Sequence, residues 1–242
     1  MGDMNNLPVS NVYVLKIIDH MNLKLSKEVI YRVIMATEVG YVHPGNWNAY
    51  NKKYCKPVVP APETTDSGVT VGIGYDCGQA TAQKILSDWN GYIPLEQAQR
   101  LAATAGLKKF AALTECNKLQ DIVIPIDVAL KQWFEKKLPK SAKETAAIYP
   151  NIGNLHPYEQ TCLISLVFNR GASLDGDRRK EMKELVAATN LDDDKAMGKL
   201  FRDMKRLWPD TRGLQIRRDL EADFIEMADN PIPPEDEYVI VI

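Results

Sequence analysis

The stretch TVGIGYD, residues 70–76, alternates small or polar residues with large apolar ones. A β-strand sends successive side chains to opposite faces, so Val71, Ile73 and Tyr75 are expected to enter a core. The other face would carry a hydroxyl, two glycines and a carboxylate. Glycine inside a strand often marks a place where a ligand or a second backbone comes close. The stretch therefore predicts a β-ribbon whose bare face is a candidate binding surface, or one whose polar ends are simply solvated.

The composition is that of a globular protein. The chain has 242 residues, of which 45% are hydrophobic and 26% are charged, and this length allows a sizeable core. A formal net charge of −2 and a pI of about 6 give no sign of nucleic-acid binding. The sequence has no apolar run long enough to span a membrane, and its start lacks the basic leader of a secretory signal. We expect synthesis in the cytoplasm, no membrane span and no nucleic-acid partner.

The four cysteines are widely spread and form no CxxC pair, which argues against a zinc ribbon or a thioredoxin-type site. Free thiols are the favoured interpretation, with disulfides left open. A Cys–His nucleophile is a weak alternative because nothing in the spacing selects a pair. The acidic stretches DGDRR (175–179) and DDDK (192–195) lack the spacing of a calcium loop. No metal and no cofactor are expected.

The order of predicted elements defines the fold class. Residues 26–40 have the apolar period of a helix, with Ser26 as N-cap and Gly40 as terminator. A proline-rich excursion then leads to the ribbon, and amphipathic helical patterns fill residues 79–228. This order predicts an α+β fold that is mostly helical. Its parts are a β-containing N-terminal lobe (1–90), a helical lobe (91–229) and an acidic C-terminal tail (230–242).

Glu38 is the sharpest single candidate for chemistry. Ile30, Ile34 and Glu38 are spaced four residues apart, so the carboxylate continues an apolar stripe. It also lies in the last helical turn, where the helix dipole disfavours an anion. Both effects are expected to push the pKa of Glu38 upward, as a general acid requires. The alternative is a glutamate that reaches water at a frayed helix end.

A glycoside hydrolase pairs such an acid with a second carboxylate that activates or positions water. Asp76 is the candidate, with Thr70 holding the same water, and Asp66 is the runner-up. Asp76 would also suit a turn or a helix cap, and the two roles are compatible. A straight strand would separate Thr70 and Asp76 by about 20 Å. We therefore predict a turn within or beside VGIGY (71–75) that brings them to one side of Glu38.

A glutamate closing a helix, then a glycine-rich strand that begins with Thr70, then a helical lobe, resembles the phage-type lysozyme superfamily. LISLVFNRG (163–171) and RRDLEADF (217–224) resemble the later helices of that family. The resemblance covers most of the chain, from about residue 26 to residue 228. Phage enzymes place the catalytic aspartate before the threonine. An aspartate after it, as Asp76 is here, is similar to pesticin-like bacteriocins and type VI secretion muramidase effectors.

The resemblance implies a lysozyme-like fold and a cofactor-free muramidase. Such an enzyme cleaves the β-1,4 bond between N-acetylmuramic acid and N-acetylglucosamine, with inversion at the anomeric carbon. It implies catalytic roles for Glu38, Asp76 and Thr70. Substrate-binding roles are expected for Tyr75, Asn169 and Arg217, and Arg217 would pair with Glu38. Arg217 could equally be part of a solvated charged face. Residues 41–66 look like an insertion that borders the cleft and modulates substrate choice.

These expectations describe an antibacterial toxin or a phage lysis enzyme that acts in the periplasm or on the cell wall. Delivery would need a dedicated route such as a holin or a type VI apparatus. The substrate would be bacterial peptidoglycan, and a toxin would have an immunity protein that occludes its cleft. The alternatives are a non-catalytic peptidoglycan-binding module of the same fold, and a peptidoglycan amidase or peptidase.

Overall fold

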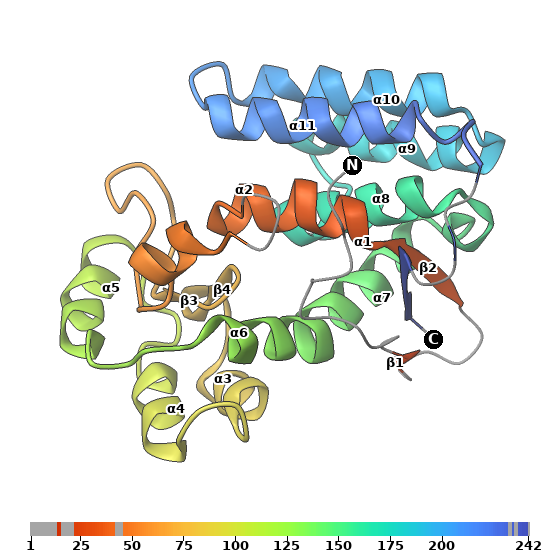
Figure 1. The fold of residues 1–242 in the computed structure, drawn as a ribbon. Helices are drawn as coiled ribbons and strands as arrows, with labels where there is room; N and C mark the ends of the chain where they lie inside the picture. The colour runs from red at the N-terminus through yellow and green to blue at the C-terminus, as the bar shows by residue number, and fades with distance from the viewer. Residues whose placement is uncertain (1–13, 16–21, 42–45, 232–233, 235–236, 242) are drawn as a thin grey trace. The chain divides into compact units, whose positions relative to one another are not determined.

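The computed structural model describes residues 14–15, 22–41, 46–231, 234 and 237–241 (Figure 1). The chain forms two compact units. The terminal unit combines Met1–Thr37 with Leu138–Ile242, and the middle unit is Glu38–Lys137. This division differs from the predicted lobes, whose boundary at residue 90 lies inside the middle unit. The two ends of the chain fall in one unit because they pair in one sheet, and local sequence patterns do not reveal such pairing.

A three-stranded sheet joins these ends in the terminal unit. Its strands are β1 (Val14–Leu15), β2 (Leu23–Ser26) and β5 (Tyr238–Val241), in the order β1–β5–β2. β5 is parallel to β1 and antiparallel to β2, with Ser26 opposite Tyr238. The side chain of Val239 is fully buried. The end of the predicted acidic tail is thus the central strand of a sheet. The sequence pattern predicted a strand at TVGIGYD, and this sheet is additional to it.

The predicted helix over 26–40 is confirmed as a continuous run of helical turns. It consists of α1 (Lys27–Val29), wider π-helical turns at η2 (Ile30–Met35) and α2 (Ala36–Val39). The Ser26 hydroxyl accepts a hydrogen bond from the Val29 amide at 3.3 Å, which is the expected N-cap. Gly40 has a φ of +67°, and this left-handed conformation ends the helix.

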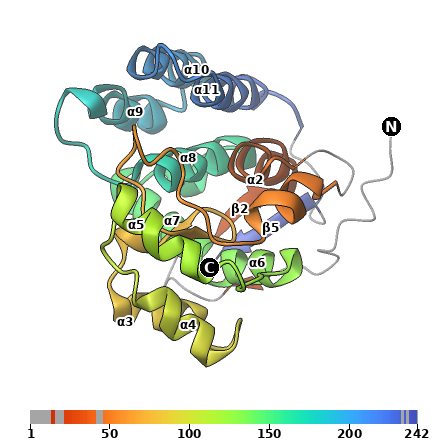
Figure 2. The same cartoon turned by 90° about the vertical axis from the view of Figure 1, so that its left-hand side faces the viewer.

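The other helices of the terminal unit form its apolar core. α8 is buried along most of its length and packs against β2, while α10 lies beside both α9 and α11 (Figures 1 and 2). None of the described helices has the length and apolarity needed to cross a membrane. The helices of the terminal unit that follow the middle unit in the chain are α7 (Leu138–Ile148), η7 (Ile152–Asn154), α8 (Pro157–Arg170), η8 (Asp177–Arg179), α9 (Lys180–Leu191), α10 (Asp194–Asp203), η9 (Met204–Leu207) and α11 (Arg212–Ile225).

The middle unit surrounds the ribbon predicted from TVGIGYD with helices. Val71, Ile73 and Tyr75 are at most 4% exposed, so the predicted core face is confirmed. The ribbon is a hairpin of β3 (Thr70–Val71) and β4 (Tyr75–Asp76). The helices are η3 (Tyr50–Tyr54), η4 (Cys77–Gln79), α3 (Ala82–Trp89), α4 (Leu95–Ala102), α5 (Lys109–Cys116), η5 (Asn117–Leu119), α6 (Ile126–Gln132) and η6 (Trp133–Lys137). The mostly helical α+β class is therefore confirmed.

Because Val239 is buried in the central strand, Val239→Ala is expected to lower the free energy of unfolding by about 2 kcal/mol. Val123→Ala is the matched control, because Val123 is 49% exposed, and it should change stability by no more than about 0.5 kcal/mol. Urea denaturation measures both. Equal, small effects would mean that β5 does not contribute to the core.

Candidate functional site

The β3–β4 hairpin brings Thr70 and Asp76 together. They are directly opposite partners in an antiparallel pair, and Val71 is opposite Tyr75. The turn between the strands contains Gly72 and Gly74, whose φ angles are +56° and +62°. Such angles favour glycine over residues that carry a Cβ. The predicted turn within VGIGY is therefore confirmed, while its placement beside Glu38 stays a prediction.

The predicted bare glycine face needs correction. Strand alternation stops at the turn, so Gly72 and Gly74 do not extend the face that carries Thr70 and Asp76. Gly72 is buried, and a Cβ added to it would lie 3.0 Å from the Trp89 ring. The glycines thus serve the turn and its packing, and they do not form a wall for a ligand.

The insertion contributes a third strand-like segment to the ribbon. Val58 forms two backbone hydrogen bonds with Thr70, at 2.7 and 3.0 Å. The amide and carbonyl of Thr70 are therefore directed to Val58 rather than to Asp76. Thr70 and Asp76 are consequently a pair without mutual backbone bonds, the kind whose side chains lie closer, with Cα atoms about 4.5 Å apart. The insertion is attached to the candidate site by this bridge; its residues 42–45 lie outside the described residues.

Asp76 is fixed by two backbone amides. Its Oδ1 accepts hydrogen bonds from Gly68 at 3.0 Å and Gly78 at 2.8 Å. The bond from Gly78 caps η4, so the expected capping role is present. No hydrogen bond to Oδ2 occurs among the residues that the structure describes. The carboxylate is thereby oriented through one oxygen, and the other remains able to accept a proton or a hydrogen bond.

The two glycines that hold Asp76 are in close backbone contact. A Cβ on Gly68 would lie 2.5 Å from Gly78 Cα and 2.6 Å from the Leu107 carbonyl oxygen. A Cβ on Gly78 would meet the same carbonyl at 2.6 Å. Because these are backbone atoms, they cannot move aside as a side chain would. Glycine at both positions lets both amides reach one carboxylate oxygen.

Opposing effects act on the acidity of Asp76. Burial raises its pKa above the usual value. The bonds from Gly78 and Gly68 and the charges of Lys108 and Lys137 act in the opposite direction, but burial dominates. A carboxylate with a raised pKa is a stronger base than an exposed aspartate, provided that it remains ionised.

The hydroxyl of Thr70 is also oriented. It donates to the Gly68 carbonyl at 3.2 Å, so its oxygen is left as an acceptor. Thr70 and Asp76 therefore present two acceptors on one face of the hairpin. A water that donated one hydrogen to each would direct a lone pair away from both. This arrangement can position and activate a nucleophilic water.

Glu38 and Asp66 occupy different settings in the middle unit. Glu38 lies in α2 and is half-buried. The Asp66 side chain is 73% exposed and forms an ion pair with Lys109 at 3.1 Å. It is not held by the hydrogen bonds that fix Asp76. This contrast favours Asp76 over Asp66 as the second carboxylate.

The predicted substrate contact at Tyr75 is not favoured by its surroundings. Its ring is 4% exposed and packs edge-on against Trp89, with centroids 5.5 Å apart. The hydroxyl donates to Asp88 at 2.8 Å, and burial raises the pKa of Tyr75 well above its usual value. A buried ring with a bonded hydroxyl supports packing of the hairpin rather than contact with a ligand.

Arg217 and Asn169 belong to the terminal unit. Arg217 is 1% exposed, so it is not part of a solvated face. Its described contacts are with Glu221 and with both the hydroxyl and the carbonyl of Ser165. Asn169 is half-buried and lines an open pocket with Arg170 and Trp208. The pairing of Arg217 with Glu38 stays a prediction.

Sequence reasoning did not identify Val58, Gly68, Gly78 or the two lysines near Asp76. The signal for the glycines was present, since SG (67–68) and CG (77–78) flank the ribbon symmetrically. Paired glycines at equal distances from a hairpin turn are compatible with a close backbone approach. Val58 had no comparable signal, because a single bridge from an irregular segment leaves no periodic pattern.

The described cysteines and histidine do not favour a thiol nucleophile. All four thiols are unpaired, and burial raises the pKa of Cys77 to about 12, so it stays protonated. His20 and His43 lie outside the described residues. The remaining histidine, His156, accepts a hydrogen bond at Nδ1 from the Tyr158 amide in a helix cap.

One carboxylate cluster lies in the terminal unit. Oxygens of Glu159, Asp192 and Asp194 lie within 4.8 Å of one another, a donor set that could hold a divalent cation. Burial, reinforced by the neighbouring Asp194 and Asp192 charges, raises the pKa of Glu159 to about 8. A proton retained on Glu159 lowers the repulsion among the three carboxylates, as a bound cation would.

Comparison with protein-family models finds no match to this chain, and comparison with curated proteins finds none either.

Gly78→Ala is expected to lower the free energy of unfolding by about 3 kcal/mol, because its Cβ would overlap the Leu107 carbonyl. Gly213→Ala in α11 is the matched control, because a Cβ there meets nothing within 4 Å. It should be neutral or stabilise by roughly 0.5 kcal/mol, as alanine does within a helix. Thermal and urea unfolding of both variants measure the difference. Normal stability of Gly78→Ala would show that the two glycines are not in contact.

Glu159 is expected to make stability depend on pH. The folded state keeps the proton up to about pH 8, whereas the unfolded chain releases it near pH 4.3. Stability is therefore lost as the pH rises through this window, by at most about 1.4 kcal/mol per pH unit. Glu159→Gln cannot ionise and should flatten the profile measured by urea unfolding between pH 5 and 8. Glu63→Gln, at an exposed position, is the control and should keep the wild-type slope. An unchanged slope in Glu159→Gln would contradict the raised pKa of Glu159.

Proposed function

We propose that the protein is a peptidoglycan muramidase with a lysozyme-like fold. It would hydrolyse the β-1,4 bond between N-acetylmuramic acid and N-acetylglucosamine with inversion at the anomeric carbon. The observation that carries the proposal is the hairpin register, which puts Thr70 directly opposite Asp76. It is supported by Glu38, which lies in the last turn of its helix and is the first residue of the middle unit.

In this mechanism Glu38 is the general acid. It gives its proton to the glycosidic oxygen as the bond from that oxygen to the anomeric carbon breaks. Water held by Thr70 and Asp76 attacks the anomeric carbon from the opposite face and loses a proton to Asp76 Oδ2. Single displacement of this kind inverts the configuration and needs room for the water between sugar and base.

The biological setting proposed is antibacterial. The substrate would be bacterial cell-wall peptidoglycan, and the enzyme would act in the periplasm or on the wall as a toxin, a type VI secretion effector or a phage lysis enzyme. Delivery would use a dedicated route. If the protein is a toxin, an immunity protein that covers Thr70 and Asp76 would protect the cell that makes it.

Intact peptidoglycan sacculi, incubated with the protein and analysed by mass spectrometry, test the reaction type. New reducing N-acetylmuramic acid ends are expected. Cut stem peptides would instead indicate an amidase or peptidase. Protein that sediments with sacculi and releases no products would indicate a glycan-binding module.

Glu38→Gln and Asp76→Asn test the assigned roles. Each removes a proton transfer and keeps a similar shape, so the rate of sacculus lysis should fall by about two or more orders of magnitude. Asp66→Asn is the matched control, because Asp66 is exposed and paired with Lys109, and it should keep the wild-type rate. Circular dichroism would show that all three variants fold. A lytic rate near wild type in Glu38→Gln, or a loss confined to Asp66→Asn, would refute the assignment.

A further inference from the structure

The terminal unit contains an open pocket of about 600 Å³ at the end of α8. Its lining includes Asn169, Arg170, residues 175–179 and Trp208. Three of these residues are arginines, at positions 170, 178 and 179. We call it the arginine pocket, and it does not include Glu38, Thr70 or Asp76.

The three arginines have no carboxylate partner within ion-pair distance in the described part of the chain. Arg170 instead donates to the Arg178 carbonyl, and Arg179 donates to the Arg170 carbonyl. Arg179 also contacts the Met182 sulfur. The guanidinium groups of Arg170 and Arg179 are thus positioned by neutral groups, and no ion pair neutralises their charge.

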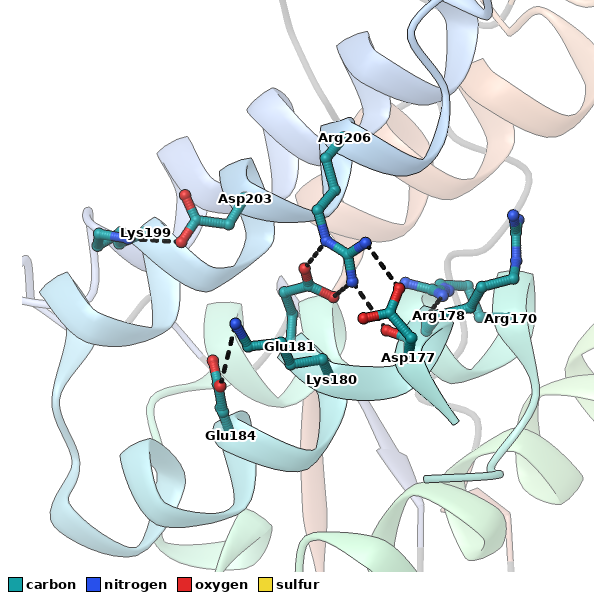
Figure 3. Close-up of polar contacts among 9 residues, drawn as sticks. All are labelled: Arg170, Asp177, Arg178, Lys180, Glu181, Glu184, Lys199, Asp203 and Arg206. Atoms are coloured by element: carbon teal, nitrogen blue, oxygen red, sulfur yellow. Dashed lines mark hydrogen bonds and ion pairs between the residues drawn. The ribbon is translucent and has the colours of Figure 1, made fainter. Parts of the chain in front are cut away.

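The neighbouring Arg206 forms ion pairs with the carboxylates beside the pocket. It reaches from η9 to Glu181 and Asp177, while Arg170 and Arg178 lie beside this group (Figure 3). The pKa of Arg206 is accordingly raised, first by Glu181 and then by Asp177. Glu181 and Asp177 therefore pair with Arg206 and form no ion pair with the pocket arginines.

Burial makes this unneutralised charge costly. The Nη1 atom of Arg170 is buried without a hydrogen-bond partner, and its guanidinium lies 5.0 Å from the centre of the Trp208 ring. Burial, and then the charge of Arg179, lowers the pKa of Arg170 to about 10. Burial and Arg178 likewise lower the pKa of Arg179. An anion in the pocket would offset the cost of burying these positive charges. Guanidinium groups bind oxyanions through paired hydrogen bonds.

We propose that the arginine pocket binds the oxyanion group of a small ligand, a carboxylate or a phosphate. The first contact would be Arg178, which is exposed, with Arg170 and Arg179 supplying charge from the half-buried wall. Asp175 and Asp177 also line the pocket and would repel a polyanion such as nucleic acid. The site therefore fits one or two negative charges. This proposal does not depend on muramidase activity.

Calorimetric titration of the full-length protein with inorganic phosphate, and separately with acetate, tests the proposal at constant ionic strength set with chloride. Chemical-shift changes at the amides of residues 175–179 would locate the binding. Arg178→Gln and Arg179→Gln should each weaken binding by about tenfold, the loss of one charge-assisted hydrogen bond. Arg32→Gln is the matched control, because Arg32 is an exposed arginine outside the pocket, and it should bind as wild type does.

Binding of phosphate alone would identify a phosphate ligand, binding of acetate alone a carboxylate ligand, and binding of both a general oxyanion site. Each of these results supports the proposal when the pocket variants weaken binding and Arg32→Gln does not. Binding of neither anion would overturn the proposal. It would also be overturned by shifts that chloride reproduces, or by equal losses in all three variants.

Discussion

The candidate site depends on one carboxylate oxygen that accepts two backbone amides. Asp76 Oδ1 joins Gly68 and Gly78 at the point where their two chain segments touch. This bond pair closes the base of the hairpin and fixes the direction of the second oxygen. The same Gly68 residue, through its carbonyl, accepts the Thr70 hydroxyl. One glycine thereby orients both polar groups of the proposed water site, and no side chain larger than hydrogen fits there.

The middle unit supports this arrangement through packing. Tyr75 is buried against Trp89 and hydrogen-bonded to Asp88. These contacts hold its side chain on the core side of the hairpin, so Asp76 faces the other side. On the open edge, Val58 supplies the backbone bonds that the edge strand would otherwise lack. The burial that rigidifies the site also raises the pKa of Asp76. Burial thus both stabilises the hairpin and makes Asp76 a stronger base.

The sequence predicted the local features well and the long-range features poorly. The helix capped by Ser26, the core face of the ribbon and its turn follow from periodicity and from glycine chemistry, which act over a few residues. The pairing of β5 with β1 and β2 joins opposite ends of the chain, and the Val58 bridge comes from an irregular segment; neither has a local signature. The ligand role of Tyr75 came from the family resemblance, whereas strand alternation placed its side chain in the core, and the structure confirms the core position. Asp88 and Trp89 bury the ring and bind its hydroxyl, and both belong to α3, so the pattern of the ribbon alone does not reveal them.

The most direct test of the proposed mechanism is the configuration of the first product. Proton NMR of peptidoglycan fragments during digestion distinguishes the two anomers of the new N-acetylmuramic acid end before they interconvert. A water held between Thr70 and Asp76 attacks opposite the leaving group, so the α-anomer should form first. First formation of the β-anomer would contradict a single displacement by that water, and the absence of any new reducing end would contradict the muramidase itself.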